Sequence, residues 1–216
     1  MAKKKSYAVI GLGRYGKAVA RELLRNGAEV LAIDMDPETV NTVAKVIPNC
    51  KCADVTQPDA LKQLGIADMD AVIIAMASRL EDTVMATMLC KEAGVKTVIV
   101  KCANTLHQRM LLKIGADQVT FPEHESGVRL AKNLVSAGFM DIAELSEDVS
   151  VVELDVKDEW EGKTLIELSL RRKYGINVVG IRKNDKLMIN IDPEMILHKD
   201  MTMIVIASNQ SLKKLV

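Results

Sequence analysis

The chain reads Val9-Ile10-Gly11-Leu12-Gly13-Arg14-Tyr15-Gly16 close to its N-terminus. This stretch fits the pattern GxGxxG, and it lies between an apolar run that begins at Tyr7 and an amphipathic segment. In that setting the first glycine permits a tight turn, the second lets the backbone approach a phosphate, and the third lets a helix pack against the strand. The free N–H groups at the start of the helix then face the anion. The stretch therefore predicts a strand, a phosphate-binding turn and a helix.

The same arrangement recurs along the first two thirds of the chain. Each short run rich in Val, Ile and Ala is followed by an amphipathic stretch of about ten residues. The apolar runs are Tyr7–Ile10, Val30–Ile33, Cys50–Ala53, Ala71–Ala77, Thr97–Lys101 and Gln118–Phe121. Continuous apolar strands indicate a sheet that is covered on both faces. With right-handed crossovers they predict an α/β fold, a Rossmann-like, doubly wound domain with a parallel six-stranded sheet.

Two charged residues near the predicted turn indicate the kind of nucleotide. Asp34 ends the second predicted strand, 18 positions after Gly16, where a carboxylate can accept hydrogen bonds from both ribose hydroxyls and disfavours a 2′-phosphate. Arg14 offers paired donors that suit a terminal phosphate such as that of ATP. The alternatives stay open that the glycines serve packing alone, that Asp34 caps a turn, and that Arg14 is a solvated helix residue.

The pattern changes after a helix that we predict from His124 to about Ala137. We divide the chain into a nucleotide-binding domain over residues 1–138, a linker over 139–148 and a C-terminal module over 149–216. The elements predicted in the module are strands at Val151–Val156, Asn177–Arg182, Lys186–Asn190 and Met201–Ala207, and a helix over Thr164–Lys173. Because Lys183-Asn184-Asp185 is typical of a hairpin turn, we expect a small α+β module with antiparallel pairs.

Composition excludes several classes of partner. The 29 basic residues balance 29 acidic ones, so the net charge is zero and nucleic acid is not an expected partner. The most apolar stretch, Ala71–Ala77, is far shorter than the roughly 20 residues that cross a bilayer. Apolar residues between Met140 and Leu145 suggest a surface that a second subunit covers. We therefore expect a soluble, cytoplasmic homo-oligomer.

Several stretches together resemble RCK domains, which regulate potassium transport. The resemblance rests on Val9–Gly16 with Asp34, Ala53-Asp54-Val55-Thr56, Lys113-Ile114-Gly115-Ala116-Asp117 and Pro122-Glu123. It extends through Lys173-Tyr174-Gly175-Ile176-Asn177-Val178, which resembles the small C-terminal RCK module. Order, spacing and domain length over almost the whole chain are similar to those of the cytosolic subunits of Ktr/Trk-type potassium uptake systems.

The resemblance implies a regulatory subunit and no enzyme. RCK dimers of this kind assemble into a ring, an octamer by this resemblance, which docks beneath an integral-membrane potassium-translocating subunit. ATP or ADP selects between ring shapes and so gates potassium flow, with NADH ranked below them as a ligand. The chain is then expected in the cytoplasm, peripherally associated with the inner face of the plasma membrane through that subunit.

The resemblance also implies which residues bind the nucleotide. Gly11–Gly16 would hold the phosphates, Asp34 the ribose, and Asp54 with Val55 the adenine edge. The implied residues are Gly11, Leu12, Gly13, Arg14, Tyr15, Gly16, Asp34, Met35, Asp54, Val55, Ala75, Met76 and Lys101. Arg14 would reach the terminal phosphate, including that of a nucleotide in a neighbouring subunit. The loop Ala75-Met76-Ala77-Ser78-Arg79 departs from the family, in which many members have a glycine and an amide there.

Two further ligands follow from the resemblance. Relatives place a divalent cation, Mg²⁺ or Ca²⁺, between paired nucleotides with a carboxylate at the position of Glu123, which offsets the repulsion of facing phosphates. The alternative to a metal-binding role is that Glu123 is an acidic residue in the first turn of a helix that begins after Pro122. Several relatives bind cyclic di-AMP in the C-terminal module; the positions that this implies here are Leu165, Arg171, Asn177 and Val178.

Two other function classes remain as alternatives. An NAD(H)-dependent oxidoreductase is compatible with the fold, but no tyrosine has a lysine four residues further on, and the C-terminal part has no cluster of His, Cys and acidic residues. A redox sensor that binds NADH and DNA conflicts with the zero net charge. Both are ranked below the regulatory subunit.

Overall fold

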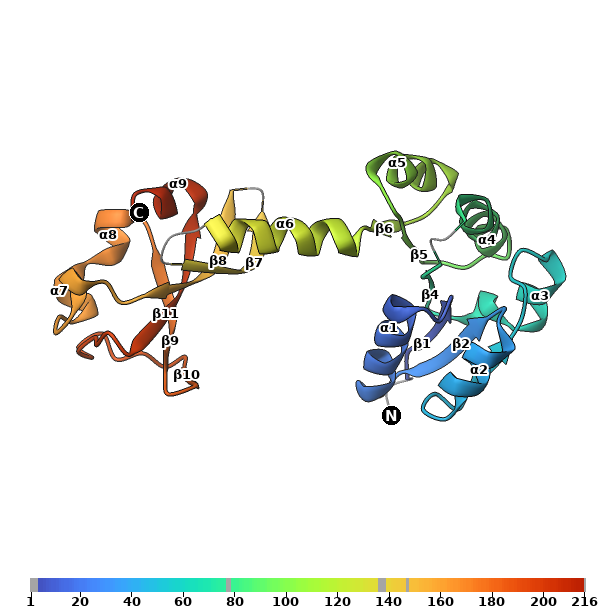
Figure 1. Cartoon of the computed structure of the whole chain (residues 1–216), viewed down its shortest axis with the longest axis horizontal. Helices are drawn as coiled ribbons and strands as arrows, with labels where there is room; N and C mark the ends of the chain where they lie inside the picture. Colours follow the sequence, from blue (N-terminus) through green and yellow to red (C-terminus); the bar gives the residue numbers. More distant parts are fainter. Residues whose placement is uncertain (1–3, 77–78, 136–138, 147, 216) are drawn as a thin grey trace. The chain divides into compact units, whose positions relative to one another are not determined.

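The computed structural model describes residues 4–76, 79–135, 139–146 and 148–215. The chain forms two compact units, Met1–Glu125 and Ser126–Val216 (Figure 1). Within the described residues, no helix combines the length and the apolar character that a membrane span requires.

The first unit is built on a parallel sheet of six strands, as the sequence predicts. The strands follow the order β3-β2-β1-β4-β5-β6, so the chain moves outward from β1 in one direction and then crosses to the other side. Their bounds are β1 Ser6–Ile10, β2 Glu29–Asp34, β3 Cys50–Cys52, β4 Ala71–Ile74, β5 Val98–Lys101 and β6 Gln118–Thr120. The strand order reverses between β1 and β4, where doubly wound sheets form their ligand crevice.

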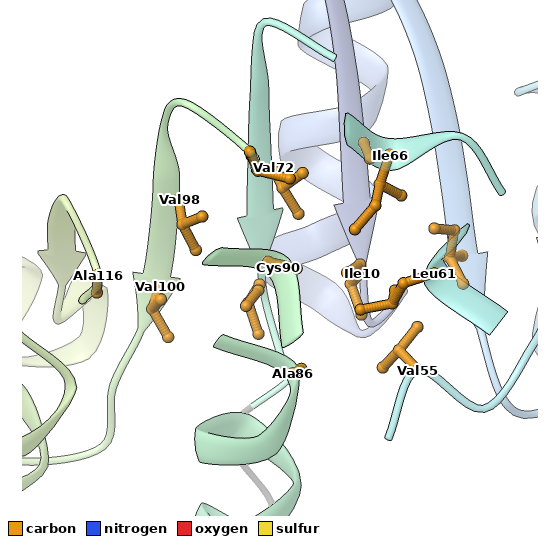
Figure 2. Packing of buried hydrophobic residues seen from close by; sticks show 14 of the residues in the cluster. Ile10, Val55, Leu61, Ile66, Val72, Ala86, Cys90, Val98, Val100 and Ala116 are labelled. Atoms are coloured by element: carbon orange, nitrogen blue, oxygen red, sulfur yellow. The ribbon is translucent and has the colours of Figure 1, made fainter. Parts of the chain in front are cut away.

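Both faces of this sheet are covered, because neighbouring residues of one strand belong to different core clusters. In β1, Ala8 and Ile10 pack into the cluster that Figure 2 shows, whereas Val9 between them packs into a second cluster. Successive side chains of a strand point to opposite faces, and all three of these residues are at most 1% exposed. The apolar runs of the sequence are therefore continuous for the reason expected of a doubly covered sheet.

Two helices of the first unit begin at a side chain that caps the helix N-terminus. Asp36 accepts hydrogen bonds from the backbone N–H groups of Glu38 and Thr39, and Asn104 accepts one from that of His107. The helices are α1 Arg14–Arg25, α2 Pro37–Ala44, α3 Pro58–Gln63, η1 Ile66–Asp68, α4 Leu80–Glu92, α5 Thr105–Ile114 and α6 Pro122–Val135. The division between the two units falls within α6.

The second unit is a small α+β module with an antiparallel sheet, as expected. The strand order is β10-β9-β11-β8-β7. The elements are β7 Phe139–Ser146, β8 Val149–Asp155, η2 Asp158–Trp160, α7 Leu165–Leu168, α8 Leu170–Tyr174, β9 Asn177–Lys183, β10 Lys186–Met188, β11 Met201–Ser208 and α9 Asn209–Lys213. Asn184 and Asp185 take left-handed φ values of 48° and 60° in the predicted hairpin turn. Leu154, Trp160 and Met203 form part of its core.

Two predictions about local structure are wrong. The helix expected over Thr164–Lys173 is two short helices, because Ser169 lies between them in the left-handed region with φ 47°. Leu168 and Leu170 are both buried, and two positions apart on one helix they would point about 200° apart. The segment 139–148, expected to be a linker, contains β7, which pairs with β8 along its length.

Other boundaries differ by a few residues. The strand expected over Ala71–Ala77 ends at Ile74. Ala77 lies outside the described residues. So do residues 136–138, at the end of the first predicted domain, and residue 147 in the predicted linker. The division of the chain into domains at 138 and 149 stays a prediction, since the compact units separate after Glu125.

Candidate functional site

A cavity of about 590 Å³ lies at the carboxyl ends of β1, β2, β3 and β4. It is lined by Ile10, Gly11, Gly13, Ile33, Asp34, Met35, Ala53, Asp54, Val55, Thr56, Ala75, Met76, Arg79 and Asp82. Parallel strands bring their carboxyl ends to one edge of the sheet, so loops from distant parts of the sequence meet there. The structure thus gathers Gly11, Gly13, Asp34, Met35, Asp54, Val55, Ala75 and Met76 from the predicted set.

The three glycines of the turn have different steric surroundings. A Cβ on Gly16 would lie 1.9 Å from the backbone oxygen of Gly11, so the helix can approach the strand only without a side chain there. Gly11 has φ +87°, and its Cβ would lie 2.8 Å from the backbone nitrogen of Met76. Around Gly13, by contrast, no atom lies within 4 Å of a Cβ. Gly11 and Gly16 are therefore required by packing, while Gly13 leaves open space that a ligand can enter.

Asp34 holds two loops together at the edge of the cavity. Its Oδ2 accepts a hydrogen bond of 2.6 Å from the backbone N–H of Leu12, and its Oδ1 accepts one of 2.9 Å from that of Asp36. The turn-capping interpretation of Asp34 is thus correct for this structure. Carboxylate oxygens have a second acceptor site each, so the same side chain, which lines the cavity, can also receive ribose hydroxyls.

Asp54 lines the cavity after β3, the strand next to β2. Its Oδ1 accepts hydrogen bonds from the Thr56 hydroxyl at 2.7 Å and from the Thr56 backbone N–H at 3.0 Å. The hydroxyl bond, followed by the backbone bond, lowers the pKa of Asp54 below its usual value. The loop Ala53–Thr56 is therefore an ordered wall with an ionised carboxylate at neutral pH.

Five predicted residues do not line this cavity: Leu12, Arg14, Tyr15, Gly16 and Lys101. The side chain of Leu12 is fully buried in the core, and only its backbone N–H contributes, through the bond to Asp34. Tyr15 packs against the same core cluster. Arg14 is the exposed first residue of α1.

Lys101 is engaged by Glu123, the residue predicted to bind a metal. The Lys101 Nζ lies 2.6 Å from the Glu123 Oε1, and it also sits over the Tyr15 ring at 5.8 Å from the centroid. The hydrogen bond from Lys101 lowers the pKa of Glu123. Among the described residues, no group of three or more His, Cys, Asp or Glu side chains can hold a metal ion. The prediction for Glu123 concerns a cation shared between two facing nucleotides, so it stays a prediction.

Sequence reasoning missed Arg79 and Asp82, which also line the cavity. Both belong to the start of α4, the helix that follows β4. The sequence contained the information needed to find them, because a residue that closely follows a central strand of a parallel sheet lies at the carboxyl edge, where ligands bind.

A second cavity, also of about 590 Å³, lies in the C-terminal unit. Its lining residues are Leu165, Ile166, Ser169, Leu170, Arg171, Arg172, Ile176, Asn177, Val178 and Pro193. The four positions implied for cyclic di-AMP, Leu165, Arg171, Asn177 and Val178, are therefore on one cavity. Arg172 adds a second guanidinium to it, which the sequence did not single out.

Two protein-family models match the sequence: the TrkA-N domain over residues 7–122 and the TrkA-C domain over residues 149–216. The chain belongs to the family of proteins that join a TrkA-N domain to a TrkA-C domain. The matches leave residues 123–148, with α6 and β7, between the two domains.

Curated relatives cover nearly the same length. The chain is 38% identical over 205 residues to the Ktr system potassium uptake protein C of Bacillus subtilis. The aligned region covers 95% of this chain and 93% of that protein. It is 34% identical to the Ktr system potassium uptake protein A of Vibrio alginolyticus, over 85% of this chain and 84% of that protein. The solved GsuK RCK domain has the same fold, with a TM-score of 0.70 at 15% identity over 99% of this chain and 47% of that one.

Proposed function

We propose that this chain is the nucleotide-sensing regulatory subunit of a Ktr/Trk-type potassium uptake system. The observation that carries the proposal is the cavity formed by the glycine turn and Asp34, in a chain 38% identical over 95% of its length to a Ktr system potassium uptake protein. The chain has no catalytic role in this proposal; its chemistry is recognition.

The lining residues suit an adenine nucleotide. The open space at Gly13 and the N-terminus of α1 accommodate phosphates. Asp34 offers acceptors to the ribose, and Asp54 and Val55, which line the same cavity, are the residues proposed to contact the adenine edge. ATP and ADP are the proposed ligands, ahead of NADH. Arg14, the exposed first residue of α1, is proposed to reach the terminal phosphate of a nucleotide in a neighbouring copy.

Regulation then requires that ATP and ADP bind two shapes of an oligomer with different affinities, since a ligand shifts an equilibrium only by its differential binding. We place the chain in a ring of dimers, of eight copies, on a separate membrane subunit that carries potassium. Ile142 and Leu145 of β7, at 41% and 58% exposure, are apolar positions that a second copy can cover.

Cyclic di-AMP is the proposed ligand of the second cavity. Arg171 and Arg172 offer guanidinium groups to its phosphates, while Leu165 and Val178 offer apolar contacts to its bases. For Mg²⁺ or Ca²⁺, one chain supplies Glu123 alone, and no step of the proposal uses a metal. The measurement for that ion is whether it tightens ATP binding equally in the wild type and in Glu123→Gln.

The first experiment is a calorimetric titration of the purified full chain with ATP, ADP, NADH and cyclic di-AMP, with particle size followed in parallel. The proposal expects tight binding of ATP and ADP and an oligomer whose size or shape depends on which one is bound. Potassium uptake by cells that carry the cognate membrane subunit should then depend on this chain. Binding of NADH alone to an unchanging small particle, or turnover of NADH with a carbonyl compound, would favour the oxidoreductase instead.

A further inference from the structure

The charges that line the first cavity are unfavourable for phosphates except at one residue. Asp34, Asp54 and Asp82 contribute carboxylates, and Arg79 is the cation among the described lining residues. A polyphosphate needs cationic partners to offset its own charge and that of nearby carboxylates. Within this cavity, Arg79 is therefore the side chain with the right charge for a phosphate.

The strand order places Arg79 at the phosphate end of the cavity. Along the sheet edge, β3 and β2 carry Asp54 and Met35, β1 carries the glycine turn, and β4 leads to Arg79. A nucleotide with its base over β2 and β3 and its first phosphate at Gly13 continues toward β4. Its last phosphate then lies closest to the start of α4.

The backbone of Arg79 is fixed while its guanidinium is only loosely held. The carbonyl of Arg79 accepts hydrogen bonds from the N–H and the hydroxyl of Thr83, at 3.3 Å and 3.1 Å. Its Nε lies 3.5 Å from Asp82, and its Nη2 lies 3.8 Å from Glu81. Both distances exceed the roughly 2.7–3.2 Å of N–H···O hydrogen bonds, and the side chain is 68% exposed. The guanidinium thus has donors for an incoming anion.

The other cations near the turn are placed less well for this role. Lys101 is paired with Glu123 at 2.6 Å, and neither Lys101 nor Arg14 lines the cavity. Arg14 faces outward from the start of α1 as an exposed residue.

We infer that Arg79 binds the terminal phosphate of the nucleotide held by its own chain and so sets the preference for ATP over ADP. The inference rests on the proposed function, because it assigns a phosphate-binding residue to that same cavity. The long contacts with Asp82 and Glu81 leave the guanidinium able to form the stronger, paired hydrogen bonds that a phosphate offers.

The test is a calorimetric titration of wild type, Arg79→Ala, Arg79→Lys and Arg25→Ala with ATP, ADP and adenosine. Arg25 is the matched control, an arginine that is 79% exposed and ion-paired with Glu22 at the far end of α1. Arg79→Ala should weaken ATP about tenfold or more, ADP about threefold or less, and adenosine not at all. Arg79→Lys should recover part of the ATP affinity, and Arg25→Ala should match wild type.

Three outcomes overturn the inference, and they have different meanings. If wild type binds ATP and Arg79→Ala binds it equally well, Arg79 has no phosphate role while the proposed function stands. If Arg79→Ala weakens adenosine as much as ATP, its effect is on the shape of the cavity. If wild type binds none of the three ligands, the proposed function fails and the Arg79 inference fails with it.

Discussion

The two cavities are similar in size, about 590 Å³ each, and differ in construction. The first is made of loops at the ends of four parallel strands, and two of its acids, Asp34 and Asp54, accept hydrogen bonds from backbone N–H groups. The second is made by α7, α8 and the start of β9, and its position depends on the left-handed turn at Ser169. In the first unit, therefore, sheet topology determines where the cavity forms; in the second, a single local conformation does.

The largest expected effect tests whether the packing of the glycine turn maintains the first unit. Gly16→Ala places a Cβ 1.9 Å from the Gly11 oxygen, so it should lower the free energy of unfolding of the first unit by about 3 kcal/mol or more. Urea unfolding followed by far-UV circular dichroism measures it. Gly13→Ala is the matched control: it meets open space, so it should fold normally and lose nucleotide affinity alone. Equal stability of the two variants would show that Gly16 has no packing role.

The second prediction tests whether the two units are independent in stability. Leu111→Ala in the first unit and Leu154→Ala in the second each remove a side chain that is at most 2% exposed, at a cost of about 3 kcal/mol. The chain has a single tryptophan, Trp160, buried in the second unit. Its fluorescence should report a lower urea midpoint for Leu154→Ala and an unchanged one for Leu111→Ala. Equal shifts would mean that the units unfold together.

A third prediction concerns ligand choice, with an expected effect of about tenfold in Kd, or about 1.4 kcal/mol. Asp34→Ala should weaken ATP and leave cyclic di-AMP unchanged, whereas Arg171→Ala should do the reverse, because each residue lines one cavity. Lys173→Ala is the control for Arg171, since Lys173 is a neighbour outside the cavity lining. Calorimetry measures all three variants. Loss of both ligands in one variant would mean that the cavities are not separate sites.

The smallest expected effect concerns the ion pair of Lys101 with Glu123 in the first unit. Because Lys101 lowers the pKa of Glu123 below its model-compound value of 4.5, the pair stabilises the folded state above that pH and loses its effect as the pH falls through the lowered pKa. Since Glu123 is 63% exposed, the contribution is below about 1 kcal/mol. Glu123→Gln should therefore be less stable than wild type at pH 7, and the difference should shrink as the pH falls below 4.5, in urea unfolding. The exposed Glu29→Gln serves as control; a difference that does not shrink as the pH falls would contradict the assignment.

The first unit was predicted well from the sequence because the patterns that define it, a glycine motif and alternating strands and helices, are local and repeated. Gly11–Gly16 and Asp34 have fixed positions relative to β1 and β2, and the apolar runs of β1, β2 and β4 are long enough to identify buried strands. Arg79 was missed as a cavity-lining residue, although its place after β4 follows from the same topology. The partner of Lys101 was also missed, because Glu123 is 22 positions away and meets it only after β6 has paired with β5.

The second unit was harder to predict for a physical reason. Thr164 and Glu167 form a capping box, which favours a helix start. The residues that follow up to Lys173 contain no glycine or proline that would predict its end. Ser169 is not a glycine, so its left-handed conformation is a result of burying Leu168 and Leu170 in one core. Likewise, β7 is a strand because β8 offers it a partner, which is a tertiary effect. The four residues of the second cavity came from family resemblance alone.

The carboxylate of Asp34 bridges the loop after β1 and the loop after β2 through two short hydrogen bonds. Loops that are joined by the protein's own atoms have little left to order when a ligand arrives, so capture costs little conformational entropy. Encounter should then proceed at similar speed for every nucleotide that fits. The time that each one stays bound becomes the quantity by which the chain distinguishes them.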